Sequence, residues 1–252
     1  MVSFSGRSDI GRRRSLNEDA IFAGDNLFVA CDGMGGHKAG EVASQLAIDV
    51  IASFVRRSAE DSEITWPYGF NQAVSFDGNR LRTAIKLANR TVLSKAASSD
   101  DYTGMGTTVV AMIVSPTRPR MTYAHVGDSR MYLIRAGAIV QLTRDDSWAS
   151  LSWEEGADPD DTTKASMKHV LTKAVGAQDD VDFEVTEQDL ESGDVILLCS
   201  DGLTNMLSDQ QILEIVVTRG VDLGGAGDDL VAAANAEGGR DNISAILVRY
   251  SS

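Results

Sequence analysis

The chain has 252 residues, of which 43% are hydrophobic and 24% charged, and its formal net charge is −14. This is the balance of a globular protein, and its acidity argues against nucleic-acid binding, because contacts to phosphate dominate that affinity. The apolar runs are too short to span a bilayer, and the polar residues 1–14 do not resemble a signal peptide, so we expect a cytoplasmic protein without a membrane partner.

The first half of the chain is expected to contain one buried strand and two helices. Residues 7–19 are polar and typical of turns, whereas residues 27–31 form an apolar run that ends at Asp32 and is followed by several glycines. Apolar residues recur every four positions over about residues 41–57 and 80–96, which predicts two amphipathic helices.

The segment between these helices, residues 61–79, contains several aromatic residues and is expected to be an ordered loop. Each of the 2 cysteines, Cys31 and Cys199, ends an apolar run, so we expect both to be buried free thiols. With only 4 prolines, no linker and no repeat, residues 1–252 are expected to form a single domain and a monomer.

The second half of the chain is expected to begin with closely spaced antiparallel strands. The predicted strands are residues 107–114, 121–126, 131–135, 138–142, 195–199 and 243–250. Helices are expected at about residues 209–219 and 228–236, and the polar, acidic residues 144–176 at the surface. Hairpins together with helix pairs predict an α+β protein, in which an antiparallel sheet packs on a second sheet and helix pairs lie outside.

Five short segments share an acidic residue next to a glycine or another small residue, close to the end of a predicted strand. They are residues 17–19, 32–36, 127–130, 200–202 and 239–242. Any one of them fits a simple turn. However, Asp32 and Asp201 each follow an apolar strand, and strands that end at one edge of a sheet would bring these carboxylates together.

Crowded carboxylates repel one another, and hard divalent cations relieve this repulsion. With 3 histidines and 2 cysteines at no zinc-type spacing, Mg²⁺ or Mn²⁺ is expected rather than zinc. Two such cations about 4 Å apart can bridge a water and lower its pKa towards neutrality, so that the resulting hydroxide attacks an electrophile. The sequence has no Gly-x-Ser-x-Gly elbow, no P-loop and no kinase signature that would favour another chemistry.

Such a site would also need a group that binds an anion. The arginines of residues 12–14 directly precede the acidic segment 17–19. A run of this kind is either a solvated basic patch or, beside an acidic site, a clamp for two phosphate oxygens.

Six motifs of the chain resemble those of the PP2C-type (PPM) phosphatases in their compact bacterial form. The motifs are residues 14–19, 32–41, 104–108, 126–130, 199–203 and 239–243, and the resemblance extends from about residue 8 to residue 250. It implies a central β-sandwich flanked by helix pairs in four αββα layers. It also implies a protein serine/threonine phosphatase that uses Mn²⁺ or Mg²⁺ and acts on phosphoserine and phosphothreonine of proteins.

The resemblance assigns roles to the carboxylates. Asp32 would bridge two metal ions and the carbonyl of Gly33 would bind one of them, while Asp201 and Asp241 would hold the other. Asp128, together with Asp201, matches the ligands of a third and weaker metal site in bacterial members.

The remaining implied roles concern the rim of the site. Glu18 and Asp19 would hold the waters of the metals, or one metal directly, and Arg14 would bind the substrate phosphate. Residues 144–176 correspond to the flap beside the active site.

The sequence departs from the family pattern at two places. Animal members carry a histidine, proposed as the general acid, where this chain has Met34. The nearby His37 is either that acid or a residue at a turn, and the leaving group could instead take its proton from metal-bound water. The segment of residues 168–176 resembles the stretch that follows the flap in the family, where Asn or Ser is usual, and His169 within it could tune the third site.

Two rival functions stay open. One is a catalytically weak scaffold of the same fold that binds a phosphoprotein, although such degenerate proteins typically lose these carboxylates. The other is a nucleotide hydrolase, for which the sequence shows no base-binding pocket. The bacterial resemblance implies that an active phosphatase opposes a serine/threonine kinase.

Overall fold

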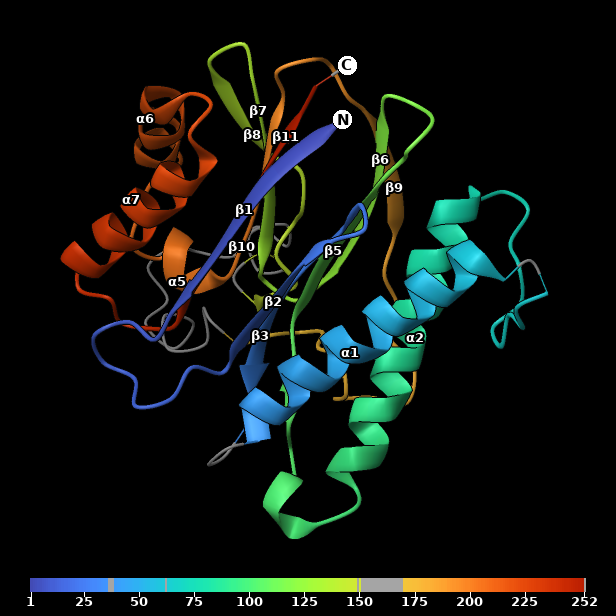
Figure 1. Ribbon diagram of the computed structural model, residues 1–252. Coiled ribbons are helices and arrows are strands. Elements are labelled where there is room, and N and C mark those ends of the chain that lie inside the picture. Colours follow the sequence, from blue (N-terminus) through green and yellow to red (C-terminus); the bar gives the residue numbers. More distant parts are fainter. Residues whose placement is uncertain (36–38, 62, 149, 151–169, 252) are drawn as a thin grey trace.

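The computed structural model describes residues 1–35, 39–61, 63–148, 150 and 170–251. Two antiparallel sheets pack face to face, and helices cover the outer face of each sheet (Figure 1). The expected α+β class with a sandwich between helix pairs is therefore confirmed.

One sheet has five strands. In spatial order they are β1 (Val2–Asp9), β11 (Ile243–Tyr250), β10 (Val195–Cys199), β7 (Arg130–Arg135) and β8 (Ala138–Gln141). Neighbouring strands are antiparallel throughout.

The second sheet has six strands. They are β2 (Asp19–Gly24), β3 (Leu27–Met34), β5 (Val109–Val114), β6 (Arg120–Val126) and β9 (Val185–Asp189) in spatial order, with β4 (Gly106–Thr107) also paired to β3. The hairpin of β2 and β3 turns at Asp25 and Asn26, which both have positive φ.

Each sheet carries its own pair of helices. The six-stranded sheet is covered by α1 (Ala39–Glu60) and α2 (Phe76–Ala96), and the five-stranded sheet by α6 (Asp209–Arg219) and α7 (Leu223–Ala236). The described residues also form two short elements, namely the 3-10 helix η1 (Asp100–Tyr102) and the single turn α5 (Asp201–Thr204).

Alternation along the central strands positions the functional site. In β3, Leu27 and Val29 pack against the helices, whereas Phe28 and Ala30 enter the core between the sheets. Asp32 has the same parity as Phe28 and Ala30, so its side chain lies where this inter-sheet core reaches the end of the strands. The fold thus places the carboxylate of Asp32 at the end of the apolar core between the two sheets.

Several expectations from the sequence are wrong at the edges of the sheets. Residues 7–9 belong to β1 and residue 19 to β2, although the segment 7–19 was expected to be turn-like. The sequence also did not predict β9. β1 and β9 are edge strands with many partly exposed residues, so they lack the continuous apolar pattern of central strands.

The helix boundaries also extend beyond the expected ones. α7 begins at Leu223, earlier than residue 228, and Ser75 caps α2 at the start of a turn that was assigned to the loop. Trp66 packs edge-to-face on Phe54, Phe70 and Phe76 at centroid distances of 5.8, 5.2 and 5.8 Å, so the aromatic residues do order the connection.

Cys31 and Cys199 are both buried and free, as expected. No helix in the described ranges carries an apolar stretch long enough to cross a membrane.

Candidate functional site

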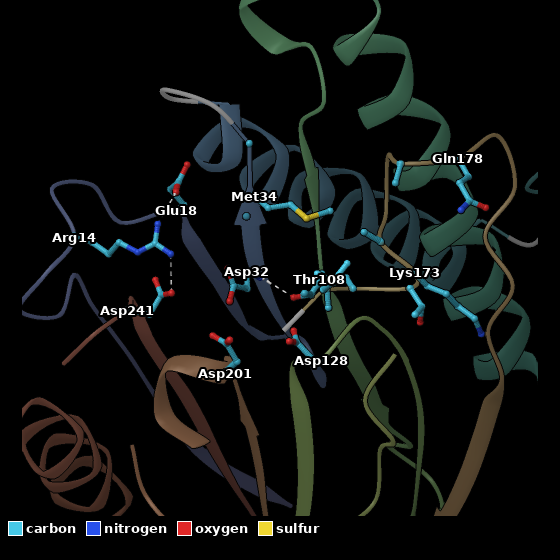
Figure 2. Close-up of a pocket in the computed structure, with 17 residues that line it drawn as sticks. Arg14, Glu18, Asp32, Met34, Thr108, Asp128, Lys173, Gln178, Asp201 and Asp241 are labelled. Carbon is cyan, nitrogen blue, oxygen red and sulfur yellow. Dashed lines mark hydrogen bonds and ion pairs between the residues drawn. The ribbon is translucent and has the colours of Figure 1, made fainter. Parts of the chain in front are cut away.

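A pocket of about 580 Å³ opens where the same ends of the two sheets meet (Figure 2). Most of the predicted site residues line it: Arg14, Glu18, Asp32, Gly33, Asp128, Asp201 and Asp241. These residues come from five separate segments of the chain, and only the fold brings them together.

The backbone of Asp32 is held by the neighbouring strands. Its N–H donates to Thr108 Oγ1 at 2.9 Å, and its carbonyl accepts from Thr107 Oγ1 at 2.9 Å and from the N–H of Thr108 at 2.8 Å. Thr108 Oγ1 also lies 2.6 Å from Ser129 Oγ, next to Asp128. Both threonines therefore hold the backbone of Asp32, and Thr108 also links it to the neighbour of Asp128, a role that the sequence did not reveal.

Asp32 and Asp201 do not lie at one edge of a single sheet, which corrects the expectation from the sequence. Asp32 belongs to β3 of the six-stranded sheet, whereas Asp201 follows β10 of the five-stranded sheet and begins α5. The carboxylates meet because the sheets are stacked with these ends on the same side. A Cβ at Gly202 would lie 1.9 Å from the carbonyl of Asn242, so α5 can approach the start of β11, beside Asp241, only with glycine there.

Asp19 does not line the pocket but lies buried behind it. It is the cross-strand partner of Asp32, and Ser200 Oγ donates to its Oδ2 at 2.7 Å. Its Oδ1 is buried and has no hydrogen-bond partner within the described part of the chain. Burial raises the pKa of Asp19 to about 7, although the hydroxyls of Ser200 and Ser244 oppose the shift.

The pKa values of other carboxylates at the site are raised in the same direction. Burial raises the pKa of Asp32 well above its usual range, and the neighbouring charges of Asp19, Asp201, Asp241 and Asp128 add to the shift. Burial also raises the pKa of Asp128 to about 7. Such a cluster resists ionisation unless a cation joins it.

Arg14 lies at the mouth of the pocket and contacts two of the carboxylates. Its Nη2 is 2.7 Å from Asp241 Oδ2 and its Nη1 is 3.8 Å from Glu18 Oε2. The hydrogen bond that Arg14 donates to Asp241 raises the pKa of Arg14, and burial raises the pKa of Glu18 while Arg14 lowers it. The Arg14 side chain is 47% exposed, so its guanidinium is accessible to an anion from solvent.

Asn242 anchors the loop that carries Arg14 and Glu18. Its Nδ2 donates to the carbonyls of Ile10 at 3.0 Å and Leu16 at 2.9 Å, and its Oδ1 accepts from the N–H of Glu18 at 2.8 Å. No role was expected for Asn242. It is a polar residue between Asp241 and the apolar strand β11, and this position was a signal that its side chain has a structural role.

The far side of the pocket from Arg14 is lined by residues 170–174, at the end of the expected flap, and by Ala177 and Gln178 just after it (Figure 2). Lys173 lies there, and its Nζ is 3.5 Å from Asp146 Oδ1. Met34 also lines the pocket. Two candidates, His37 and His169, and most of the expected flap lie outside the described residues.

The donor set fits divalent cations that keep part of their water. In the described ranges, no three His, Cys, Asp or Glu side chains converge closely enough to hold one ion by themselves, as a closed zinc site would require. Mg²⁺ and Mn²⁺ use only one or two carboxylates each and retain waters. The buried oxygen of Asp19 and the raised pKa values of Asp32 and Asp128 suit such cations.

Comparison with known proteins gives a consistent result. The family described as protein phosphatase 2C matches residues 6–247. The chain is 33% identical over 248 residues to the serine/threonine protein phosphatase PstP of Mycobacterium tuberculosis, covering 98% of this chain and 45% of that protein. It is 34% identical over 253 residues to the serine/threonine phosphatase stp of Listeria monocytogenes, covering 96% of this chain and 93% of that protein.

Solved structures agree with these relatives. The catalytic domain of PstP in complex with two manganese ions superposes with a TM-score of 0.82 at 31% identity, covering 100% of this chain and 99% of that one. The chain thus spans less than half the length of the mycobacterial PstP and nearly all of its catalytic domain.

Proposed function

The chain belongs to the protein phosphatase 2C family, and we propose that it hydrolyses phosphoserine and phosphothreonine in proteins with the help of divalent cations. The observation that carries this proposal is the pocket in which Asp32, Asp128, Asp201 and Asp241 converge beneath Arg14. A carboxylate cluster with an accessible guanidinium at its mouth suits cations together with a phosphate.

The carboxylates would hold the cations. Asp32 would contact two ions, the carbonyl of Gly33 one of them, and Asp201 and Asp241 the other, while Asp128 with Asp201 would form a third, weaker site. The two manganese ions bound by the catalytic domain of PstP support Mn²⁺ or Mg²⁺. When bound, such cations lower the pKa of a water and polarise the phosphoryl group.

The residues behind and beside this cluster would support it. Glu18 and Asp19 would accept hydrogen bonds from the waters of the cations or bind one ion directly, and the buried Oδ1 of Asp19 leaves an acceptor for this purpose. Thr108 would keep Asp32 in place through its bond to the Asp32 N–H.

Arg14 would bind and orient the substrate. Its planar guanidinium can donate to two phosphate oxygens at once, and Asp241 holds it at the mouth of the pocket. Met34 carries no proton for the leaving serine or threonine oxygen. His37 stays a prediction for that role.

The decisive experiment is an assay of the purified protein with p-nitrophenyl phosphate and with phosphothreonine peptides, with Mn²⁺, with Mg²⁺ and with EDTA. We expect hydrolysis that requires one of the cations. The proposal fails if excess Mn²⁺ supports no hydrolysis of either substrate.

The same preparation tests the rival functions. A scaffold without catalysis should bind no pair of Mn²⁺ ions tightly in titration calorimetry, whereas an enzyme should. A nucleotide hydrolase should turn over nucleoside triphosphates faster than phosphopeptides. In the cell, the proposed enzyme would oppose a serine/threonine kinase, and phosphoproteomics after deletion would identify its substrates.

A further inference from the structure

We propose that Arg12, Arg13 and Arg240, named the arginine rim, bind anionic side chains that flank the phosphorylated residue of the substrate. The inference rests on the proposed function and adds the class of substrate: phosphoproteins whose phosphorylated residue has acidic neighbours.

The arginine rim lies beside the mouth of the pocket because each of its members adjoins a residue of the site. Arg12 and Arg13 directly precede Arg14, and Arg240 directly precedes Asp241. Arg14 and Asp241 are joined by an ion pair of 2.7 Å, so the two loops meet at the point where the phosphate would bind. A substrate held by Arg14 would therefore lie close to the backbone segments that carry these arginines.

The two loops are held together by their backbones. The N–H of Arg12 donates to the carbonyl of Gly239 at 2.7 Å. A Cβ at Gly11 would lie 2.1 Å from the carbonyl oxygen of Asp241, and one at Gly239 would lie 2.9 Å from the nitrogen of Arg12. Both glycines also have positive φ, 79° and 48°, so the close approach depends on glycine at each position. The fold itself therefore brings the backbone that carries Arg12 and Arg13 next to the backbone that carries Arg240.

The positive charges of the arginine rim are not paired with acidic side chains of the described residues. Many other surface arginines are paired with acids, as in Arg7 with Asp228 and Arg219 with Asp229. In contrast, all three rim arginines are exposed, and none forms an ion pair with a described residue. Three unpaired positive charges on neighbouring backbone segments repel one another, and an anion relieves this repulsion, so the cluster favours an anionic ligand.

The reach of these side chains sets where the anions should lie. Consecutive Cα atoms are 3.8 Å apart, so the Cα of Arg12 is at most about 7.6 Å from that of Arg14. An extended peptide advances by about 3.3 Å per residue. Once Arg14 holds the phosphate, the arginine rim can contact substrate side chains about one to three residues away. Since the protein as a whole carries a net charge of −14, it would otherwise repel acidic substrates.

The test compares phosphothreonine peptides with three flanking residues on each side that are alanine, aspartate or lysine, and a fourth peptide with a second phosphate instead of the aspartates. With Mn²⁺, the wild type should have a KM for the aspartate peptide about five- to tenfold below that for the alanine peptide, as expected for a few exposed charge pairs. This advantage should shrink in 300 mM NaCl because salt screens exposed charges. The doubly phosphorylated peptide tells whether a carboxylate or a second phosphate is the better ligand.

The variant Arg12→Gln/Arg13→Gln/Arg240→Gln should lose the preference for the aspartate peptide. Its kcat and KM for p-nitrophenyl phosphate should not change, because that substrate has no flanking residues. A matched control removes the same charge from other exposed arginines, Arg57→Gln/Arg90→Gln/Arg118→Gln, and should keep the preference.

Equal KM ratios in the wild type and in the rim variant would overturn the inference, as would a wild type without preference for aspartate. To separate this result from a failure of the proposed function, the same peptides are made with a non-hydrolysable phosphonate and their binding is measured by fluorescence anisotropy. Tighter binding of the aspartate peptide that depends on the arginine rim would support the inference even for a protein without turnover. A protein that hydrolyses all peptides equally would retain the proposed function and exclude the arginine rim.

Discussion

Asp32 lies at the centre of the site and interacts with residues from several other segments. It is the cross-strand partner of Asp19, its backbone is fixed by Thr107 and Thr108, and its carboxylate faces the charges of Asp201 and Asp241. Burial and the neighbouring carboxylates raise its pKa, so ionising Asp32 in the folded protein without metal is unfavourable. A residue kept under such strain is better explained by function than by stability.

We therefore expect Asp32→Asn to abolish most of the activity without weakening the fold. The amide keeps the shape of the side chain but loses the charge that would hold the cations, and kcat/KM for p-nitrophenyl phosphate should fall at least about a thousandfold, or ~4 kcal/mol. In EDTA, the variant should melt at the same temperature as the wild type or above it, because a buried charge is removed.

The matched control is Asp25→Asn in the turn between β2 and β3, an exposed aspartate outside the pocket, which should keep full activity. Near-normal turnover by Asp32→Asn would contradict the central role of this carboxylate. A melting temperature well below that of the wild type would instead indicate a structural role.

At the scale of elements, the site depends on how α5 follows β10. β10 is buried along its whole length, and the chain leaves it at Ser200 and turns at once into α5, which carries Asp201. Gly202 allows this turn to approach the start of β11, where Asp241 and Asn242 lie. The close approach of the α5 backbone to the start of β11 thus decides where Asp201 lies relative to Asp241.

Replacing this glycine tests the arrangement. The Cβ of Gly202→Ala would lie 1.9 Å from the carbonyl oxygen of Asn242, so α5 or β11 must shift. We expect a destabilisation of about 1–3 kcal/mol in urea unfolding. Binding of Mn²⁺ in calorimetry should weaken as well, because Asp201 moves away from Asp241.

A control in the next helix separates stability from function. Ser208 forms a capping box with Gln211 at the start of α6, away from the pocket. Ser208→Ala should cost about 1 kcal/mol of stability and leave Mn²⁺ binding unchanged. If Gly202→Ala behaved in the same way as Ser208→Ala, the close approach would have no bearing on the site.

At the scale of the whole molecule, the carboxylate cluster links metal binding to stability. In the folded protein without metal, the pKa values of Asp19 and Asp128 are about 7, whereas an aspartate in an unfolded chain titrates near pH ~4. Between these values the folded state binds more protons than the unfolded state. Stability must therefore fall as the pH rises through this window.

We expect the melting temperature in EDTA to decrease from pH 5 to pH 7.5. Excess Mn²⁺ should raise it most at the higher pH, because cations bind only the ionised carboxylates of the folded state. Differential scanning fluorimetry across this pH range provides the measurement.

A variant can separate the contribution of one carboxyl group to this pH dependence from the general repulsion between the negative charges of an acidic protein. Asp128→Asn removes one raised pKa and should flatten the decrease in EDTA. A melting temperature that rises steadily from pH 5 to pH 7.5 in EDTA would contradict the raised pKa values.

The sequence by itself determined the central strands and most of the candidate residues that line the pocket. The apolar runs that form β3 and β10 are buried on both faces, and this produces a signal that needs no knowledge of the fold. An acid directly after such a run must lie near the end of a buried strand, so Asp32 and Asp201 could be recognised as site candidates. The glycine-rich motifs around them then indicated the family.

Only the tertiary structure decided how these residues are combined. That Asp32 and Asp201 come from different sheets, and that Asp19 lies behind the pocket, depends on the stacking of the sheets, to which segments far apart in the chain contribute. The edge strands β1 and β9 are polar because only part of their surface is buried, so their sequences resemble loops. The contact that joins Arg12 to Gly239 connects residues from the two ends of the chain, and no local pattern encodes it.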